Sequence, residues 1–188
     1  MCGIAGLIHK GKTVNIGKEL QDMLQALKHR GPDSTGYALY GEGNRDNYIM
    51  RFKVGENVKE GSSAVNEDKS VYDSRKKQVD KHIRDLGADI LKDEQLTPYS
   101  FRYVVKYDKD LMEFSKKVES VKMTEILSLG KSLELVKDIG DANTVSKQYG
   151  LDKIKGTHAI GHSRMATETG VDIRSAHPFW GYPFSDVS

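Results

Sequence analysis

Apolar positions near the N-terminus follow two patterns, which predict a strand and then a helix. Residues 4–8 form a short apolar run that ends before Gly11, which is typical of a buried strand at the start of a chain. Between residues 20 and 27 the apolar side chains recur at helical spacing, and Asn15 is placed to cap this helix. The Gly-Pro-Asp sequence at 31–33 then ends it.

Two short apolar and aromatic segments follow, at 37–40 and 48–52. A Gly-Glu-Gly-Asn sequence at 41–44 lies between them and has the composition of a tight turn. The pattern therefore predicts a hairpin in which these two strands pair with each other.

The middle of the chain, from about 55 to 155, has a different composition. Up to about residue 92 it is dense in both charges and poor in aromatic residues, which favours solvated helix and loop. Beyond that point enough β-branched and aromatic residues return to pack a core, so we expect a folded insertion and not a disordered linker. The patterns predict strands at 101–107 and 133–136, and helices at 111–118 and 142–149.

Polar and apolar residues alternate from 157 onward, which predicts a strand that runs into a loop near residue 167. Arg164 and Thr167 fall at the end of this strand, where recognition residues are often found. The segment 175–180 contains a proline and two adjacent aromatic residues and is expected to form a turn.

Composition narrows the functional class. The chain has 188 residues, of which 37% are hydrophobic and 30% charged, and its net charge is +2 with both signs interspersed. This balance gives no electrostatic case for nucleic-acid binding. No apolar run approaches the ~20 residues of a membrane helix, and the N-terminus lacks the order of a signal peptide. We therefore expect a cytoplasmic protein, in agreement with a single cysteine that cannot form an internal disulfide.

That cysteine, Cys2, directly follows Met1. Removal of Met1 gives one residue both a thiol and a free α-amine, which titrates near ~8 against ~10.4 for lysine and so accepts a proton at neutral pH. Cys2 is thus a candidate nucleophile that carries its own base. A redox-sensing cysteine on an unrelated α/β domain is an alternative.

Four segments together resemble the class II glutamine amidotransferases, which are N-terminal-nucleophile enzymes. They are the N-terminal Cys-Gly-Ile-Ala-Gly, the segments 29–36 and 161–167, and Ala-His-Pro-Phe at 176–179. The resemblance implies an α+β fold, an αββα sandwich of two antiparallel sheets flanked by helices. It further implies one amidotransferase domain over 1–188 with a large α/β insertion at about 55–155. An insertion at this place is similar to the amidotransferase part of glutamate synthases.

The resemblance also implies a reaction and the residues that carry it. Cys2 would attack the side-chain carboxamide of L-glutamine, forming a thioester that is hydrolysed to glutamate. Arg164 and Thr167 would hold the substrate's α-carboxylate. Arg30 is the third residue assigned to the substrate site; it would lie close to the nucleophile and orient Cys2 or steady its loop, although a simple charge at a helix C-terminus explains it equally well. The ammonia would pass to a synthase partner, such as a flavin- and iron-sulfur-containing glutamate-synthase-like subunit, and no cofactor is expected in this chain.

The remaining motif residues are expected to be structural. With an α-amine available as base, a Cys-His dyad is unnecessary, so we expect the histidines of the motifs to pack or to order loops. These are His29, His158, His162 and His177. The motif glycines, Gly31, Gly36 and Gly161, are expected to permit close backbone approach, since no phosphate-binding Lys-Ser or Lys-Thr follows them.

Some positions depart from the family pattern. Met165 and Glu168 stand where relatives often carry Trp and His. The family's oxyanion-hole Asn-Gly pair and a later acidic residue would lie beyond Ser188, so we expect a C-terminally truncated domain. The alternative function is therefore a catalytically silent module of the same fold that acts in assembly or regulation.

Overall fold

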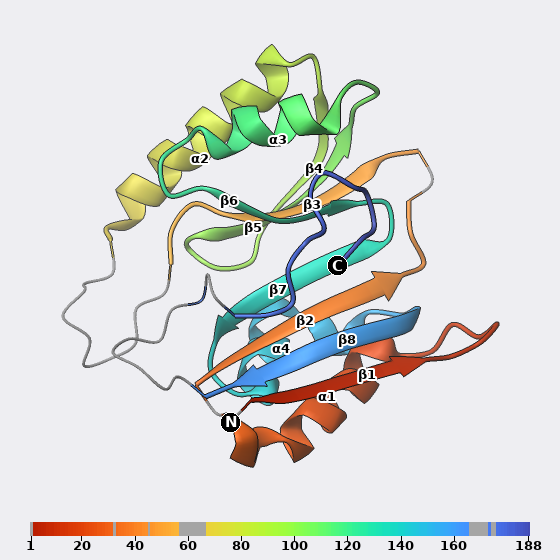
Figure 1. The fold of residues 1–188 in the computed structure, drawn as a ribbon. Coiled ribbons are helices and arrows are strands. Elements are labelled where there is room, and N and C mark those ends of the chain that lie inside the picture. Colours follow the sequence, from red (N-terminus) through yellow and green to blue (C-terminus); the bar gives the residue numbers. More distant parts are fainter. Residues whose placement is uncertain (1, 32, 45, 57–66, 166–172, 174–175) are drawn as a thin grey trace.

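The computed structural model describes residues 2–31, 33–44, 46–56, 67–165, 173 and 176–188. Within them the chain forms two four-stranded antiparallel sheets and four α-helices (Figure 1). This α+β arrangement is compatible with the expected sandwich. Among the described helices, none has both the length and the apolar character needed to cross a bilayer.

The first sheet, called sheet A, contains the strand that follows Cys2 and the strand that ends at Arg164. Its strand order is β1-β8-β2-β7, and every pairing is antiparallel. Helices α1 (Ile16–Ala26) and α4 (Ala142–Tyr149) contact this sheet and bury an apolar cluster against it. The strands of sheet A are β1 (Gly3–Ile8), β2 (Ser34–Gly41), β7 (Leu133–Ile139) and β8 (Gly156–Arg164).

The second sheet, sheet B, is built mostly from the middle of the chain. Its strand order is β4-β5-β3-β6, with α2 (Lys69–Asp85) and α3 (Leu111–Glu119) packed against it (Figure 1). Aromatic side chains such as Phe52 and Phe101 fill the core between this sheet and its helices. The strands of sheet B are β3 (Tyr48–Lys53), β4 (Asp89–Gln95), β5 (Ser100–Lys106) and β6 (Glu125–Gly130).

Most of the expected elements are confirmed. The N-terminal strand is β1, and Asn15 caps α1 by accepting a hydrogen bond from the backbone N–H of Lys18. The strands expected at 101–107 and 133–136 and the helices at 111–118 and 142–149 are β5, β7, α3 and α4. Two short 3₁₀ helices, η1 (Lys28–Arg30) and η2 (Leu151–Lys153), follow α1 and α4.

The predicted hairpin at 37–52 is wrong. β2 pairs with β7 and β8 in sheet A, whereas β3 pairs with β5 and β6 in sheet B. The connecting turn instead contacts the β6–β7 turn, because Gly41 N donates to Ser132 O and Asn44 N to Lys131 O. Both turns therefore carry the chain from one sheet to the other, side by side. A turn signal alone does not reveal whether the flanking strands share a sheet.

The charged stretch up to residue 92 also differs from expectation at its end. Helix α2 occupies most of the described part of this stretch. The strand β4 then begins at Asp89, and the side chains of this strand are mostly exposed. β4 is an edge strand, so charged residues are tolerated and discourage pairing with other chains. The strand β6 was not anticipated either. Residues 55–155 thus supply β4, β5 and β6 to sheet B and β7 to sheet A, so this segment shares both sheets with its flanks.

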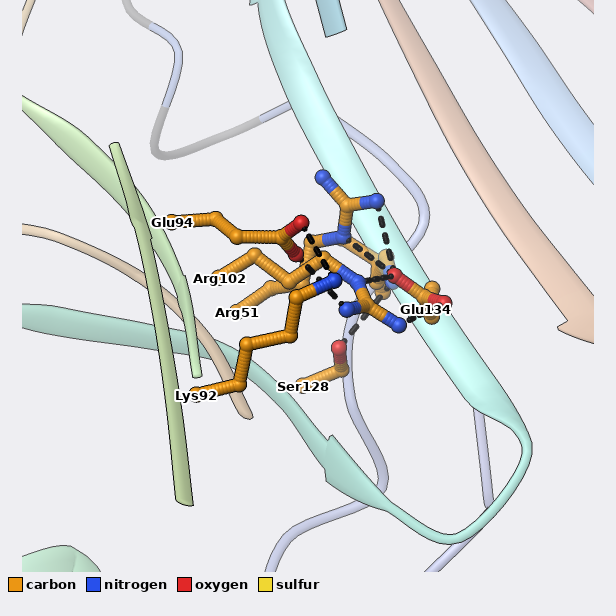
Figure 2. Close-up of polar contacts among 7 residues, drawn as sticks. Arg51, Lys92, Glu94, Arg102, Ser128 and Glu134 are labelled. Carbon is orange, nitrogen blue, oxygen red and sulfur yellow. Dashed lines mark hydrogen bonds and ion pairs between the residues drawn. The ribbon is translucent and has the colours of Figure 1, made fainter. Parts of the chain in front are cut away.

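A buried ion cluster joins the two sheets. Glu134 on β7 accepts hydrogen bonds from Arg51 on β3 and Arg102 on β5, with Nε–Oε2 distances of 2.8 and 2.7 Å (Figure 2). Arg102 also donates to Glu94 on β4, and Ser128 Oγ on β6 accepts from the backbone N–H of Leu135. Burial alone would raise the pKa of Glu134, but the two guanidinium groups outweigh it and hold that pKa at about 2.

We predict that Glu134→Gln destabilises the protein by about 3–5 kcal/mol, because the buried Arg51 loses its carboxylate partner and the partly buried Arg102 keeps only Glu94. Urea denaturation of both proteins measures this difference. Glu94→Gln is the matched control, since Glu94 is one-third exposed and its loss should cost under about 1 kcal/mol.

The same carboxylate predicts a pH dependence. Because the folded pKa lies below the ordinary value of 4.5, its stabilising effect is present above that value and is lost as the pH falls toward about 2. Equal stability of Glu134→Gln and the wild type at neutral pH would contradict this account.

Candidate active site around Cys2

Cys2 lies directly before β1, an edge strand of sheet A, and its side chain is exposed. It borders a cavity of about 480 Å³. Cys2 and the start of β1 form one wall of this cavity, strand β8 forms a second wall, and the C-terminal segment forms a third. The lining residues are Cys2, Ile4, Ile160, Gly161, His162, Arg164, His177, Pro178 and Ser188.

Strand register explains why Arg164 reaches this cavity. In the antiparallel β1–β8 pair, Gly3 lies opposite Ser163 and Ile4 opposite His162. Continuing the register by one residue places Cys2 opposite Arg164. Because side chains alternate across a strand, His162 and Arg164 then share the face of Cys2 and Ile4. Two segments about 160 residues apart in sequence thus meet through backbone pairing, at the positions that the motifs indicated.

The motif glycines bring backbone segments together at this end of sheet A, as expected. A Cβ on Gly31 would lie 2.6 Å from Met165 N, and one on Gly36 would lie 2.8 Å from Pro178 Cδ. At Gly161 it would lie 2.5 Å from Leu24 Cδ1. No side chain fits at such distances, so glycine permits the segments around Arg164 and Pro178 to approach. The backbone N–H of Asp33 also donates to Arg164 O at 3.1 Å.

The other predicted site residues are placed differently. Arg30 ends the 3₁₀ helix η1 and does not line the cavity. A Cβ on Gly3 would contact Arg30 Cβ at 3.4 Å, which puts Arg30 behind β1, on the face that meets α1. Thr167 and Glu168 lie outside the described residues, whereas Met165 is a half-exposed residue just after β8. The structure thus brings together Cys2 and Arg164 among the predicted residues.

Two histidines that the sequence analysis treated as structural also line the cavity. His162 is 5% exposed, and its ring meets that of His177 edge-on with centroids 5.3 Å apart. Burial, followed by the nearby His177 and Arg164, lowers the pKa of His162, which keeps its ring neutral at neutral pH. The alternation of polar and apolar residues at 157–167 could have indicated that His162 lies beside Arg164, because positions 162 and 164 share a face of the strand.

The C-terminal segment is held in place by Asp186. Its carboxylate accepts hydrogen bonds from the backbone N–H groups of Lys131, Ser132 and Leu133 in the β6–β7 turn, at 3.0, 2.6 and 2.8 Å. Burial alone would raise the pKa of Asp186, but these bonds and one from Ser185 hold it at about 2. This clasp carries the chain end toward β2, where Ser188 Oγ lies 2.8 Å from Tyr40 Oη.

The sequence of this chain is similar to those of known proteins. No protein-family model matches the chain. A protein of Methanothermobacter thermautotrophicus named "Putative glutamine amidotransferase" is 34% identical over 193 residues, which cover 100% of this chain and 59% of that protein. The "Glutamine amidotransferase-like protein GlxB" of Rhizobium meliloti is 30% identical over 190 residues, covering 95% of this chain and 54% of that protein.

These relatives support a glutamine amidotransferase family. A shorter match supports it too, since 50 residues are 48% identical to the "Putative asparagine synthetase [glutamine-hydrolyzing] 2" of Methanocaldococcus jannaschii. That match covers 27% of this chain and 9% of the synthetase. The chain spans little more than half the length of these two amidotransferase-named relatives.

We predict that Asp186→Asn loosens the wall that contains Ser188. Asparagine tolerates the positive φ of 58° at this position, so the change chiefly removes the charge that accepts three backbone N–H groups. Amide hydrogen exchange at residues 131–133 should accelerate on the order of tenfold, in line with about 1.4 kcal/mol of lost hydrogen bonding. Ser185→Ala is the control, because it spares the backbone bonds. Unaltered exchange in Asp186→Asn would contradict the clasp.

Proposed function

We propose that this chain is the glutaminase domain of a class II glutamine amidotransferase, which hydrolyses L-glutamine to glutamate and ammonia. The observation that carries the proposal is the shared cavity, in which the candidate nucleophile Cys2 faces Arg164 across paired strands. The names of the relatives support the substrate. The two antiparallel sheets with helices packed on them support the N-terminal-nucleophile sandwich that this class uses.

In the proposed reaction the Cys2 thiol is the nucleophile. Its sulfur forms a bond to the carboxamide carbon of glutamine, while the α-amine of Cys2 takes the thiol proton. The C–N bond then breaks, and the amine returns the proton to the leaving nitrogen, so that ammonia departs and a thioester remains. Water hydrolyses the thioester to glutamate and restores the thiol. The mechanism requires removal of Met1, because an amide nitrogen does not accept this proton.

Arg164 is proposed to hold the α-carboxylate of glutamine, with Thr167 as its partner in the motif. A planar guanidinium binds a carboxylate through two parallel hydrogen bonds, which a lysine does not reproduce. The position of Arg164 opposite Cys2 supports a substrate that spans the two residues. Arg30, behind β1, is proposed to steady the loop around the nucleophile.

The ammonia is proposed to pass to a synthase partner encoded separately or joined to this domain. One relative is named as a glutamine-hydrolysing asparagine synthetase, which supports the pairing of such a domain with a synthase. A glutamate-synthase-like subunit in the cytoplasm remains our choice, on the resemblance of the middle segment. The reaction as proposed needs no cofactor from this chain.

We predict that Cys2→Ser reduces glutamine hydrolysis to the background rate, because a hydroxyl is a far weaker nucleophile than a thiolate. Glutamate release from glutamine measures the activity, and intact mass spectrometry establishes that Met1 is absent from both proteins. A diazo-ketone glutamine analogue should alkylate the wild type at Cys2. Undiminished hydrolysis by Cys2→Ser, or the absence of glutamate release by the processed wild type, would refute the proposed function.

We further predict that Arg164→Lys raises the KM for glutamine by about 10- to 100-fold, as expected for the loss of one charge-assisted hydrogen bond. The kcat should change much less, because the α-carboxylate is bound equally in the ground and transition states. Arg84→Lys, an exposed arginine of α2, is the matched control. A KM that stays at the wild-type value in Arg164→Lys would remove Arg164 from the substrate site.

A further inference from the structure

The cavity wall formed by His177 and Pro178 rests on one row of positions across sheet A. Lys137 on β7 lies directly opposite Gly36 on β2, and Gly36 lies directly opposite His162 on β8. Residues that pair in this way point to the same face of a sheet. The row therefore leads across three strands to the edge of the cavity.

Each position of this row contacts the segment that forms the wall. The ring of Phe179 lies over Lys137, with Nζ 4.5 Å from the ring centroid. A Cβ on Gly36 would lie 2.0 Å from His177 O, so the backbone of the segment crosses β2 in direct contact. The ring of His177 meets that of His162 edge-on, with centroids 5.3 Å apart. Three neighbouring strands thus hold the segment.

Phe179 is fixed at the β7 end of the row by a charge. The residue is 45% exposed, so hydrophobic burial supplies only part of the free energy that fixes its ring. The ring contacts the ammonium of Lys137 and, at a centroid distance of 4.8 Å, the ring of His177. A cation is attracted to an aromatic face, and more strongly where water is excluded. Lys137 is only 3% exposed, which favours a strong contact.

The ammonium of Lys137 is itself held by Glu125 on β6. Nζ of Lys137 lies 3.1 Å from Glu125 Oε1, and Nζ of Lys53 lies 3.1 Å from Glu125 Oε2. The two lysines are equally buried, and Lys53 also pairs with Glu56. Among the described residues, only Lys137 of this pair lies over an aromatic ring. Lys53 is therefore a close comparison for the role of that ring.

We infer that Lys137 is a positioning residue of the site, because its contact with Phe179 holds the segment in the conformation in which His177 and Pro178 close the cavity. This inference rests on the proposed glutaminase function. Without the contact, glutamine binds only to the fraction of molecules whose wall is in place. The apparent affinity falls with that fraction, whereas the reaction of bound glutamine is unchanged.

Substitutions on both sides of the contact test the inference. Lys137→Met removes the charge and keeps a long apolar side chain, while Glu125 keeps its ion pair with Lys53. We expect the KM for glutamine to rise about three- to tenfold with little change in kcat. Phe179→Leu should give a similar rise, and the double variant should not exceed the larger single effect, because both changes remove one contact. Phe179→Tyr keeps the aromatic face and should keep the wild-type KM.

Lys53→Met is the matched control, since it removes an equally buried ammonium from the same carboxylate. It should lower the melting temperature and leave the KM unchanged. A purely structural role of Lys137 would likewise reduce stability and the amount of active protein, without changing the KM of the folded molecules. The KM therefore separates positioning from stability.

A second measurement needs no catalysis. Trp180, the single tryptophan of the chain, directly follows Phe179 and is half-buried. Its fluorescence should be quenched by acrylamide more strongly in Lys137→Met and Phe179→Leu than in the wild type. Lys53→Met and Phe179→Tyr should leave the quenching unchanged.

The inference is overturned if Lys137→Met keeps the wild-type KM, if Lys53→Met raises the KM as much, or if the effects of Lys137→Met and Phe179→Leu add in the double variant. Should Lys137→Met not fold, Phe179→Leu decides, because its site is partly exposed: wild-type KM and quenching would then overturn the inference. Failure of the proposed function has a different signature. The wild type then releases no glutamate, while the quenching of Trp180 still responds to Lys137→Met.

Discussion

The carboxylate of Glu134 joins the two sheets through buried hydrogen bonds and ion pairs. Sheet B presents Arg51 and Arg102 on the face that meets sheet A, and both guanidinium groups bind this single side chain of β7 (Figure 2). Burial of Arg51 without this carboxylate would be strongly unfavourable. The interaction therefore helps to specify how β7 of sheet A lies against sheet B, together with the bond from Tyr99 to Asp138 and the ion pair between Lys137 and Glu125. Apolar packing alone would leave that alignment less defined.

From β7 the constraint extends across sheet A to the candidate nucleophile. β7 pairs with β2, β2 with β8, and β8 with β1, so the position of each strand depends on its neighbour. A slip of one residue between β1 and β8 would turn Arg164 and His162 away from the cavity. Glycines at the crowded end of the sheet permit the close approach that this register requires. The site is thus a product of strand pairing and not of any local motif.

The cavity combines three kinds of polar side chain. An exposed thiol, a guanidinium and a neutral imidazole face the same space, while aliphatic side chains of β1 and β8 complete its wall. Their chemical differences suit a substrate with a carboxamide at one end and a carboxylate at the other. The clasp formed by Asp186 carries the chain end to the same cavity, so the wall also depends on the β6–β7 turn.

Local sequence determined much of the secondary structure and the chemistry. Periodicity located β1, α1 and β5, and the motifs indicated Cys2 and Arg164, because strand and helix patterns and reactive residue types are properties of short segments. Three features depended on tertiary structure. β2 and β3 belong to different sheets because long-range partners outcompete the turn between them, and β4 is charged because it lies at an edge.

The third is the cavity beside Cys2. The sequence determined that a thiol and a guanidinium occur in segments that resemble motifs of the glutamine amidotransferases. Only the tertiary structure decided that they line one cavity, because strand pairing brings together segments about 160 residues apart in the sequence.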